Sequence, residues 1–228
     1  MDEQRTRRSV FIAGATGYMG RRLAEELLRR GHTVSGLVRS GSQGKLPTGC
    51  RCVVGNALDR TSFIDAVGSV DSYIQLVGVA HASPSKARPF REIDQKSLEE
   101  SLAVAVRNRV AQFVYVSVAH PAPAMHAYIE VRTHCESLLQ QSGLNATILR
   151  PWYVLGPGHR WPCVLIPFYW LARQIPAWSE GATRLGLVTL QQMVGALVFS
   201  VESPATGVRV LGVPEIAAVS AKIAPVAA

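Results

Sequence analysis

The chain has 228 residues, 48% hydrophobic and 18% charged, which suffices for one α/β domain with a small appended region and excludes a disordered chain. Its four cysteines are too few and too scattered to predict a disulfide framework or a zinc site. The net charge of +8 is spread along the chain, which favours attraction of anionic small molecules over binding to nucleic acid. The first eight residues are polar and hold no signal-peptide pattern, so we expect a cytoplasmic protein.

Short apolar runs alternate with segments of helical spacing over the first 150 residues. We predict strands at residues 9–13, 33–38, 52–54, 72–77, 112–117 and 145–150. Helices are predicted between them, at residues 17–30, 61–67, 91–107 and 127–141. This alternation implies βαβ units, and right-handed crossovers then give a doubly wound parallel sheet of the Rossmann type.

The rhythm changes after residue 150. An apolar segment, 161–178, is short for a membrane span and holds three prolines and Arg173, so we expect it to be buried or to line a pocket. A surface-attached lid that contacts a membrane is the less favoured alternative. A helix at 188–201, with Thr189 as its N-cap, and a strand at 207–213 follow. We therefore predict a dinucleotide-binding domain at 1–150 and a small cap region at 151–228, on the C-terminal edge of the sheet.

The strongest motif is a glycine loop between the first strand and the first helix. Gly14 allows a tight turn, Gly17 leaves room for a pyrophosphate, and Gly20 lets the helix pack closely on the sheet. The helix N-terminus then offers free N–H groups and partial positive charge to the phosphates. The pattern predicts dinucleotide binding by Gly14, Thr16, Gly17, Tyr18, Met19 and Gly20.

The end of the second strand indicates which dinucleotide is bound. An NAD-binding domain usually has an acid there, but this position holds Val38, and Arg39 follows it. A carboxylate would repel a 2′-phosphate, whereas an arginine can pair with it, with Ser40 and Lys45 as possible helpers. The sequence therefore favours NADP over NAD. The alternatives are that Arg39 stacks on adenine or faces solvent.

Several blocks of the chain resemble the atypical and extended short-chain dehydrogenase/reductase superfamily. The resemblance rests on the Gly-x-x-Gly-x-x-Gly loop, Gly55–Asp59, Phe113–Ser117, Tyr128-x-x-x-Arg132-x-x-x-Glu136, and Ser142–Pro151 followed by Gly156-Pro157-Gly158. It implies that adenine lies beside two residues after the third strand and that the fourth strand lines the groove. It also implies that the backbone after the sixth strand meets the nicotinamide. The further cofactor-binding residues implied are Asn56, Ala57, Val77, Gly78, Ser117, Arg132, Pro151, Trp152 and Val154.

The same resemblance implies a catalytic group. The superfamily uses a Tyr-x-x-x-Lys pair, which here is Tyr128 and Arg132, with a serine upstream. Arginine supplies charge to the ribose but does not shuttle protons at neutral pH. Ser117 is either the catalytic serine or a strand-end residue that bonds locally, and His120 is more readily explained as a loop residue than as an acid–base group. Asp94 occupies the asparagine position and is either a functional group or a solvated helix residue.

Two functions remain open at this point. The first is an NADP(H)-dependent oxidoreductase or epimerase-like enzyme that acts on an apolar carbonyl or alcohol, with Tyr128 as the acid/base. The second is a non-catalytic NADP(H)-binding redox sensor or assembly factor, which the missing lysine favours. The pattern predicts a small-molecule substrate, no metal and no nucleic acid, and it does not predict an oligomeric state.

Overall fold

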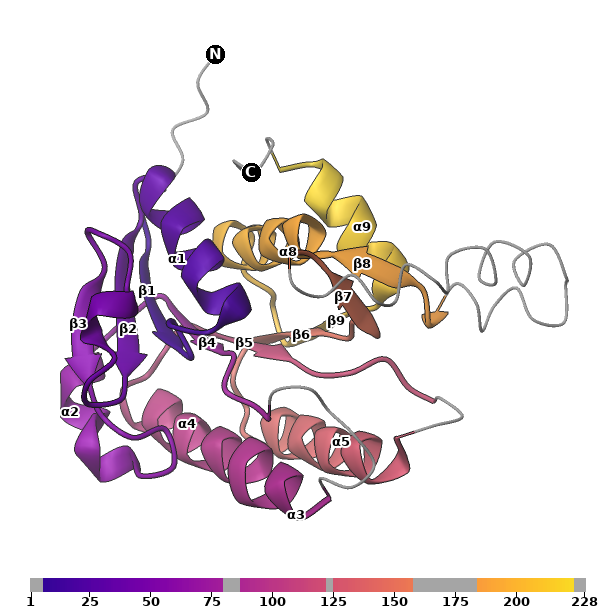
Figure 1. The fold of residues 1–228 in the computed structure, drawn as a ribbon, viewed down its shortest axis with the longest axis horizontal. Helices are drawn as coiled ribbons and strands as arrows, with labels where there is room; N and C mark the ends of the chain where they lie inside the picture. Colours follow the sequence, from indigo (N-terminus) through magenta and orange to yellow (C-terminus); the bar gives the residue numbers. More distant parts are fainter. Residues whose placement is uncertain (1–5, 80–86, 122–124, 158–183, 224–228) are drawn as a thin grey trace, which may run out of the picture.

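The computed structural model describes residues 6–79, 87–121, 125–157 and 184–223. A seven-stranded sheet crosses the molecule and has helices on both faces (Figure 1). Its strands follow the order β3-β2-β1-β4-β5-β6-β9, and every neighbouring pair is parallel. The predicted doubly wound parallel sheet is therefore confirmed.

The bounds of most of these elements lie within a few residues of the predicted ones. The strands of the sheet are β1 Ser9–Ala13, β2 Thr33–Val38, β3 Arg51–Val54, β4 Ser72–Gln75, β5 Gln112–Val116, β6 Ala146–Leu149 and β9 Val208–Leu211. The described α-helices are α1 Tyr18–Arg29, α2 Ile64–Val67, α3 Ala87–Pro89, α4 Lys96–Arg107, α5 His126–Gln141, α8 Leu190–Glu202 and α9 Val213–Ala221. Short 3₁₀ turns are η1 Gln43–Lys45 and η2 Arg60–Ser62.

Each face of the sheet has its own hydrophobic core, because successive strand residues point to opposite sides. In β1, Phe11 and Ala13 belong to the core that includes buried residues of α4 and α5. Val10 and Ile12 belong to the other core, which includes α1, α8 and α9. Figure 1 shows these two helical layers on either side of the sheet. Burial on both faces explains why the strands are continuous apolar runs.

The order of the strands reverses at β1. This strand pairs with β2 on one side and with β4 on the other. Helix α1, which follows β1, lies on the opposite face of the sheet from α4, which follows β4 (Figure 1). Loops that leave the carboxyl ends of β1 and β4 therefore diverge, and a crevice opens between them. In sheets of this kind ligands bind in that crevice.

Part of the region after residue 150 extends the sheet. Strand β9 pairs with β6, and α8 packs against α1 on one face. Two details of the sequence prediction are wrong here. Val188 lies in a short strand, β8 Leu187–Thr189, which pairs with β7 Tyr153–Leu155, and the helix begins only at Leu190. Val213 begins α9 instead of ending a strand. The predicted N-cap is confirmed, because Thr189 forms a capping box with Gln192.

The predicted helix at 91–107 is not regular. It begins with a π-helical turn, η4 Phe90–Gln95, and continues as α4. Single π-turns of this kind often occur at functional sites because they bring otherwise misaligned side chains to one point. Asp94 lies in this turn, and it is 1% exposed. It is therefore not a solvated helix residue.

Candidate dinucleotide site

A pocket of about 440 Å³ opens at the carboxyl ends of the first four strands. Eight of the residues predicted from the sequence line it: Gly14, Thr16, Gly17, Arg39, Asn56, Ala57, Val77 and Gly78. The lining residues that were not among the predicted cofactor-binding residues are Leu37, Val38, Gly55, Leu58, Leu76, Val79 and Ile93. All of these except Ile93 lie at or just beyond the ends of strands that the sequence did predict. Adjacency to those ends was therefore the signal that could have found them.

The glycine loop forms the floor of the pocket, and it packs closely against the strands around it. Gly14 has φ +92°, and a Cβ there would lie 2.9 Å from the carbonyl carbon of Leu76. The Gly17 N–H donates to the Gly14 carbonyl oxygen at 3.0 Å, which closes the turn, and a Cβ on Gly20 would overlap the same oxygen. Helix α1 thus begins directly at the loop. Its first turn holds no acid, so its N-terminus is suited to an anion.

Arg39 follows the last residue of β2 and lines the pocket. Among the described residues that line the pocket it is the single charged one, and its exposed side chain has no ion pair or hydrogen bond within the described part of the chain. Val38, in the usual position of the acid, is 2% exposed. The pocket therefore presents a cation where an NAD-specific site would present a carboxylate.

Asp94 and Arg132 form a buried ion pair behind this pocket. Nη2 of Arg132 donates to Oδ1 of Asp94, and Nη1 donates to the hydroxyl of Tyr115 at 3.0 Å and to the carbonyl of Val116 at 2.9 Å. The other carboxylate oxygen of Asp94 accepts from the N–H of Val79 at 3.0 Å. Both terminal nitrogens of Arg132 thus have partners inside the protein. Sequence reasoning missed Tyr115, because nothing in the sequence relates it to α5.

Burial shapes the protonation of this pair. It raises the pKa of the Asp94 carboxyl, against the opposing effects of Arg132 and of the Val79 N–H. Burial also disfavours charge on Arg132, but Tyr115, Tyr128 and Asp94 outweigh it and hold the pKa of Arg132 well above its usual value. Arg132 therefore stays a cation and exchanges no proton.

Tyr128 and Arg132 do come together on α5, as their spacing predicts. The Cζ of Arg132 lies 5.0 Å from the centre of the Tyr128 ring, and the Phe90 ring packs on the same tyrosine at 4.8 Å. Ser117 follows β5, is 3% exposed, and its hydroxyl has no hydrogen-bond partner among the described residues. Buried hydroxyls are rarely left unpaired, so this one is suited to a group outside the described chain.

The remaining predicted site residues are not among the described residues that line the pocket. Tyr18 and Met19 begin α1, and the carbonyl of Pro151 accepts from the N–H of Ala119 at 2.8 Å. The Trp152 ring packs on that of Tyr153 at 5.4 Å, and Val154 pairs with Val188 between β7 and β8. His120 lies 3.6 Å from Glu136, which also pairs with Arg150. The predicted apolar segment 161–178 lies outside the described residues.

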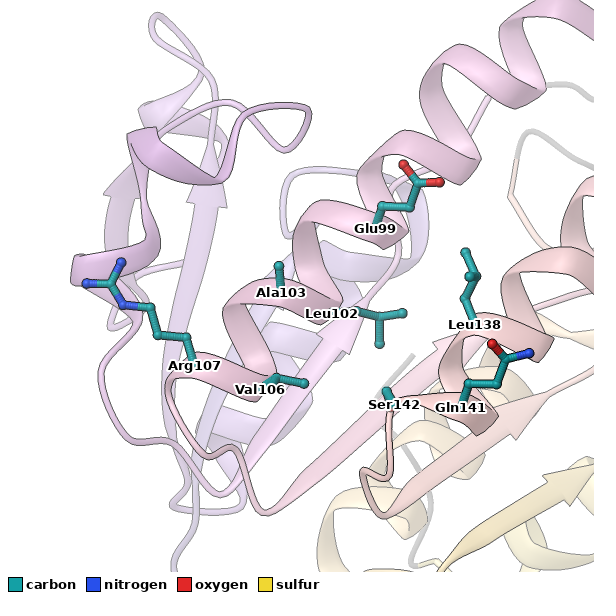
Figure 2. Close-up of a pocket in the computed structure, with 8 residues that line it drawn as sticks. All are labelled: Glu99, Leu102, Ala103, Val106, Arg107, Leu138, Gln141 and Ser142. Carbon is teal, nitrogen blue, oxygen red and sulfur yellow. The ribbon is translucent and has the colours of Figure 1, made fainter.

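A second hollow lies between α4 and α5, on the outer side of those helices. Figure 2 shows Leu102 of α4 and Leu138 of α5 on the facing sides of these helices, and Glu99 also lines the hollow from α4. Its lining is mainly apolar and holds no glycine loop or strand end. It therefore lacks the features of a dinucleotide site.

Within the described ranges, no helix is both long enough and apolar enough to span a bilayer.

The residues at the carboxyl edge fit a nicotinamide dinucleotide. The glycine loop approaches a phosphate position without side chains, and apolar residues such as Leu37, Ala57 and Ile93 offer walls to a flat base. Arg39 adds a cation, and the hydroxyl of Ser117 is a polar group with no hydrogen-bond partner among the described residues. When bound, such a cofactor supplies or accepts a hydride.

Comparison with known proteins agrees with this geometry. A family model described as NAD(P)H-binding matches residues 14–159. A 3-diazoavenalumate denitrifying reductase of a Streptomyces species is 30% identical over 87% of this chain and 73% of its own length. Photosystem II assembly factor Ycf39 of Cyanophora paradoxa is 23% identical over 62% of this chain and 44% of its own length. Apart from the reductase, the chain spans about half the length of the curated relatives it matches.

A solved structure extends the likeness to the whole fold. The WbmH enzyme of Bordetella bronchiseptica, in complex with NAD+, superimposes with a TM-score of 0.68 at 23% identity, covering 89% of this chain and 75% of that one. The glycine loop, the doubly wound sheet and the family match all point the same way. The chain belongs to the NAD(P)H-binding family of atypical short-chain dehydrogenases/reductases, which bind a nicotinamide dinucleotide.

Proposed function

We propose that this protein is an NADP(H)-dependent oxidoreductase, which reduces a carbonyl group or oxidises the corresponding alcohol of an apolar small molecule. The observation that carries the cofactor choice is Arg39. It is the single charged side chain among the described pocket residues, and it has no partner among them. The guanidinium of Arg39 could donate two hydrogen bonds to a 2′-phosphate on the adenosine ribose.

The chemistry is assigned to groups beside the same edge of the sheet. The hydroxyl of Tyr128 gives or takes the proton at the substrate oxygen, and the hydroxyl of Ser117 donates a hydrogen bond to that oxygen. Arg132 contributes a fixed positive charge against the Tyr128 ring and takes no part in proton transfer. An apolar substrate is supported by the neighbouring rings of Trp152 and Tyr153. A reduction is supported by the 30% identical relative, which is named a reductase.

The Arg39→Ala variant tests the cofactor choice. We expect the wild-type protein to bind NADPH more tightly than NADH, and we expect the variant to lose about 10- to 100-fold of NADPH affinity while its NADH affinity is unchanged. A charge-assisted hydrogen bond of about 1.5–3 kcal/mol accounts for this loss. Binding is measured by the fluorescence of the reduced nicotinamide, with Arg51→Ala as a control, since Arg51 bonds to Ser35 and Ala66 away from the pocket. Equal affinities of the wild-type protein for the two cofactors would contradict the proposal.

A non-catalytic NADP(H)-binding accessory factor is the second candidate. The observation that favours it is the commitment of both terminal nitrogens of Arg132 to protein groups, where the superfamily has a lysine that serves the ribose. A relative named as an assembly factor gives it further support. A screen of aldehydes, ketones and nucleotide sugars with NADPH separates the two candidates. Turnover supports the enzyme, and tight NADPH binding without turnover supports the accessory factor.

A further inference from the structure

The ion pair of Asp94 and Arg132 joins four separate segments of the chain. Asp94 comes from η4 and Arg132 from α5. Their hydrogen bonds reach the N–H of Val79, which follows β4, and the carbonyl of Val116 in β5. The side chains of both charged residues are almost fully buried, at 0% and 8% exposure. A charge pair with this many backbone partners fixes the relative position of those segments.

The same pair lies directly behind one wall of the dinucleotide pocket. Residues 77–79, which we call the 77–79 wall, line the pocket. A Cβ on Gly78 would lie 2.7 Å from Nη2 of Arg132 and 3.0 Å from Oδ1 of Asp94. The backbone of the wall therefore rests against the ion pair with no side chain between them. A displacement of either charged group moves the wall.

We propose that Asp94 and Arg132 are positioning residues, which hold the 77–79 wall in the place where it contacts the dinucleotide. Without the Asp94 carboxylate, the Val79 N–H loses its acceptor and Arg132 loses its counter-ion. The wall then loses the support behind it, and the pocket has to be rebuilt by the ligand when it binds. This role rests on the proposed function only in that the same pocket is used. It assigns to Arg132 a structural charge in place of a contact with the cofactor.

The proposal predicts that loss of the ion pair leaves the selectivity between NADH and NADPH unchanged. The 77–79 wall follows β4, whereas Arg39, which is proposed to read the adenosine 2′ position, follows β2, and β1 lies between these two strands. Loss of the wall weakens binding of NADH and NADPH by the same factor. Loss of Arg39 changes the ratio of the two affinities. The two proposals therefore fail in distinguishable ways.

The main test is Asp94→Asn, which removes the charge and keeps the size of the side chain. We expect the dissociation constants for NADH and NADPH both to rise about tenfold, because a buried hydrogen bond to a charged group is lost. The ratio of the two constants should stay unchanged. Binding is measured by reduced-nicotinamide fluorescence at a temperature where thermal unfolding shows the variant to be folded. Affinities within twofold of the wild-type values would overturn the proposal, and so would a change in the ratio alone.

A milder pair of variants keeps the test decisive if Asp94→Asn does not fold. Tyr115→Phe removes only the hydroxyl that accepts from Arg132, and Tyr73→Phe makes the same change on the neighbouring strand, where the hydroxyl bonds to Ser101. Both side chains are buried, at 1% and 0% exposure. We expect Tyr115→Phe to lower the affinity for both dinucleotides by about threefold to tenfold, and Tyr73→Phe to leave both affinities unchanged. Equal effects of the two variants would show a general loss of packing and would overturn the positioning role.

Discussion

Two arginines near the dinucleotide pocket have opposite surroundings, and their surroundings decide what each can do. Arg39 is exposed at the end of a strand and has no partner in the described chain. Arg132 is buried, and its terminal nitrogens bond to Asp94, Tyr115 and Val116. An exposed guanidinium without a partner gains from binding an anion, whereas a buried one with internal partners would have to give up some of those bonds to turn towards a ligand. The residue type alone does not distinguish these roles.

Gly17 tests whether the glycine loop is the pyrophosphate site. A valine there places a side chain on the pocket floor, where the helix N–H groups point. We expect Gly17→Val to lower the affinity for either dinucleotide by more than about 100-fold while the protein still unfolds cooperatively. Gly44→Val is the matched control, because a Cβ at Gly44 meets nothing within 4 Å. Full binding by a folded Gly17→Val protein would exclude the loop as the site.

Tyr128 tests the proposed reaction. Its hydroxyl matters only where a proton moves, so we expect Tyr128→Phe to lower kcat by about 10²- to 10⁴-fold and to leave NADPH affinity within a factor of about three. The phenylalanine ring keeps the packing on Phe90 and Arg132. Steady-state kinetics with a substrate from the carbonyl screen, beside a fluorescence titration, measures both. Turnover that survives the change would remove Tyr128 from the mechanism.

At the scale of elements, a charge cluster fastens α1 to α8. Glu26 is 3% exposed and accepts hydrogen bonds from Arg29 and Arg30, and Arg30 also reaches Glu202 at the end of α8. Burial alone would raise the pKa of the Glu26 carboxyl, but its bonds to the two arginines hold that pKa below its ordinary value of 4.5. Glu26 therefore stabilises the folded protein only while it is ionised.

This cluster predicts how the free energy of unfolding changes at acid pH. Because the folded pKa of Glu26 is lowered, its contribution is complete above about pH 4.5 and is lost as the pH falls through the folded pKa. We expect the free energy of unfolding to fall below pH 4.5, and to fall less steeply in Glu26→Gln. Urea unfolding between pH 3 and 7 measures this. Glu25→Gln is the control, because Glu25 pairs with Arg21 on the surface of the same helix. Parallel profiles for wild type and Glu26→Gln would contradict the assignment.

The sequence predicts the regular elements well because each carries its own local signal. The strands are buried on both faces, so short runs such as Val10–Ala13 stand out, and Thr189 identifies the start of α8 through its capping box. Elements without a local signal were missed. The β7–β8 pair depends on contacts between residues more than thirty positions apart, and the π-turn at Phe90–Gln95 is an irregularity within a helical pattern.

The same distinction holds for the site. Gly14, Gly17 and Arg39 were predicted because their positions follow directly from strand and helix ends. The contact between Asp94 and Arg132 could not be predicted from spacing, since it depends on how η4 and α5 pack across one face of the sheet. Spacing correctly placed Tyr128 beside Arg132, but it could not show that the guanidinium already has internal partners.

At the scale of the molecule, one sheet connects both hydrophobic cores. Buried residues of α1, α8 and α9 share a core with alternate residues of β1, β4 and β5, whose other residues belong to the core beneath α4 and α5. Strand β9 closes the far edge of this sheet beside β6. Both cores of the described chain are thus built on the same strands, and we expect it to unfold as one unit.

Leu197 tests this expectation. Its side chain is fully buried in α8, so Leu197→Ala removes transfer energy and leaves a cavity, at a cost of about 2–5 kcal/mol. We expect the loss to be the same by tryptophan fluorescence and by far-ultraviolet circular dichroism during urea unfolding, because both cores fail together. Val208→Ala, on the exposed side of the edge strand, should change stability by about 0.5 kcal/mol or less. Two separated transitions would show that the faces unfold independently.

The late position of α8 and β9 in the chain affects how the protein folds while it is being synthesised on the ribosome. Strands β1 to β6 and helices α4 and α5 are translated before residue 190, so the face with α4 and α5 can be covered early. Of the helices that the structure describes, the opposite face has α1 alone until α8 emerges, and its apolar residues, such as Ile12, Ile74 and Val114, are covered by α8 only then. Translation proceeds at about 5–20 residues per second, so this face stays open to water, or to a chaperone, for several seconds. The described residues that line the dinucleotide pocket all emerge by residue 93, and so they are present while half of the core is still missing.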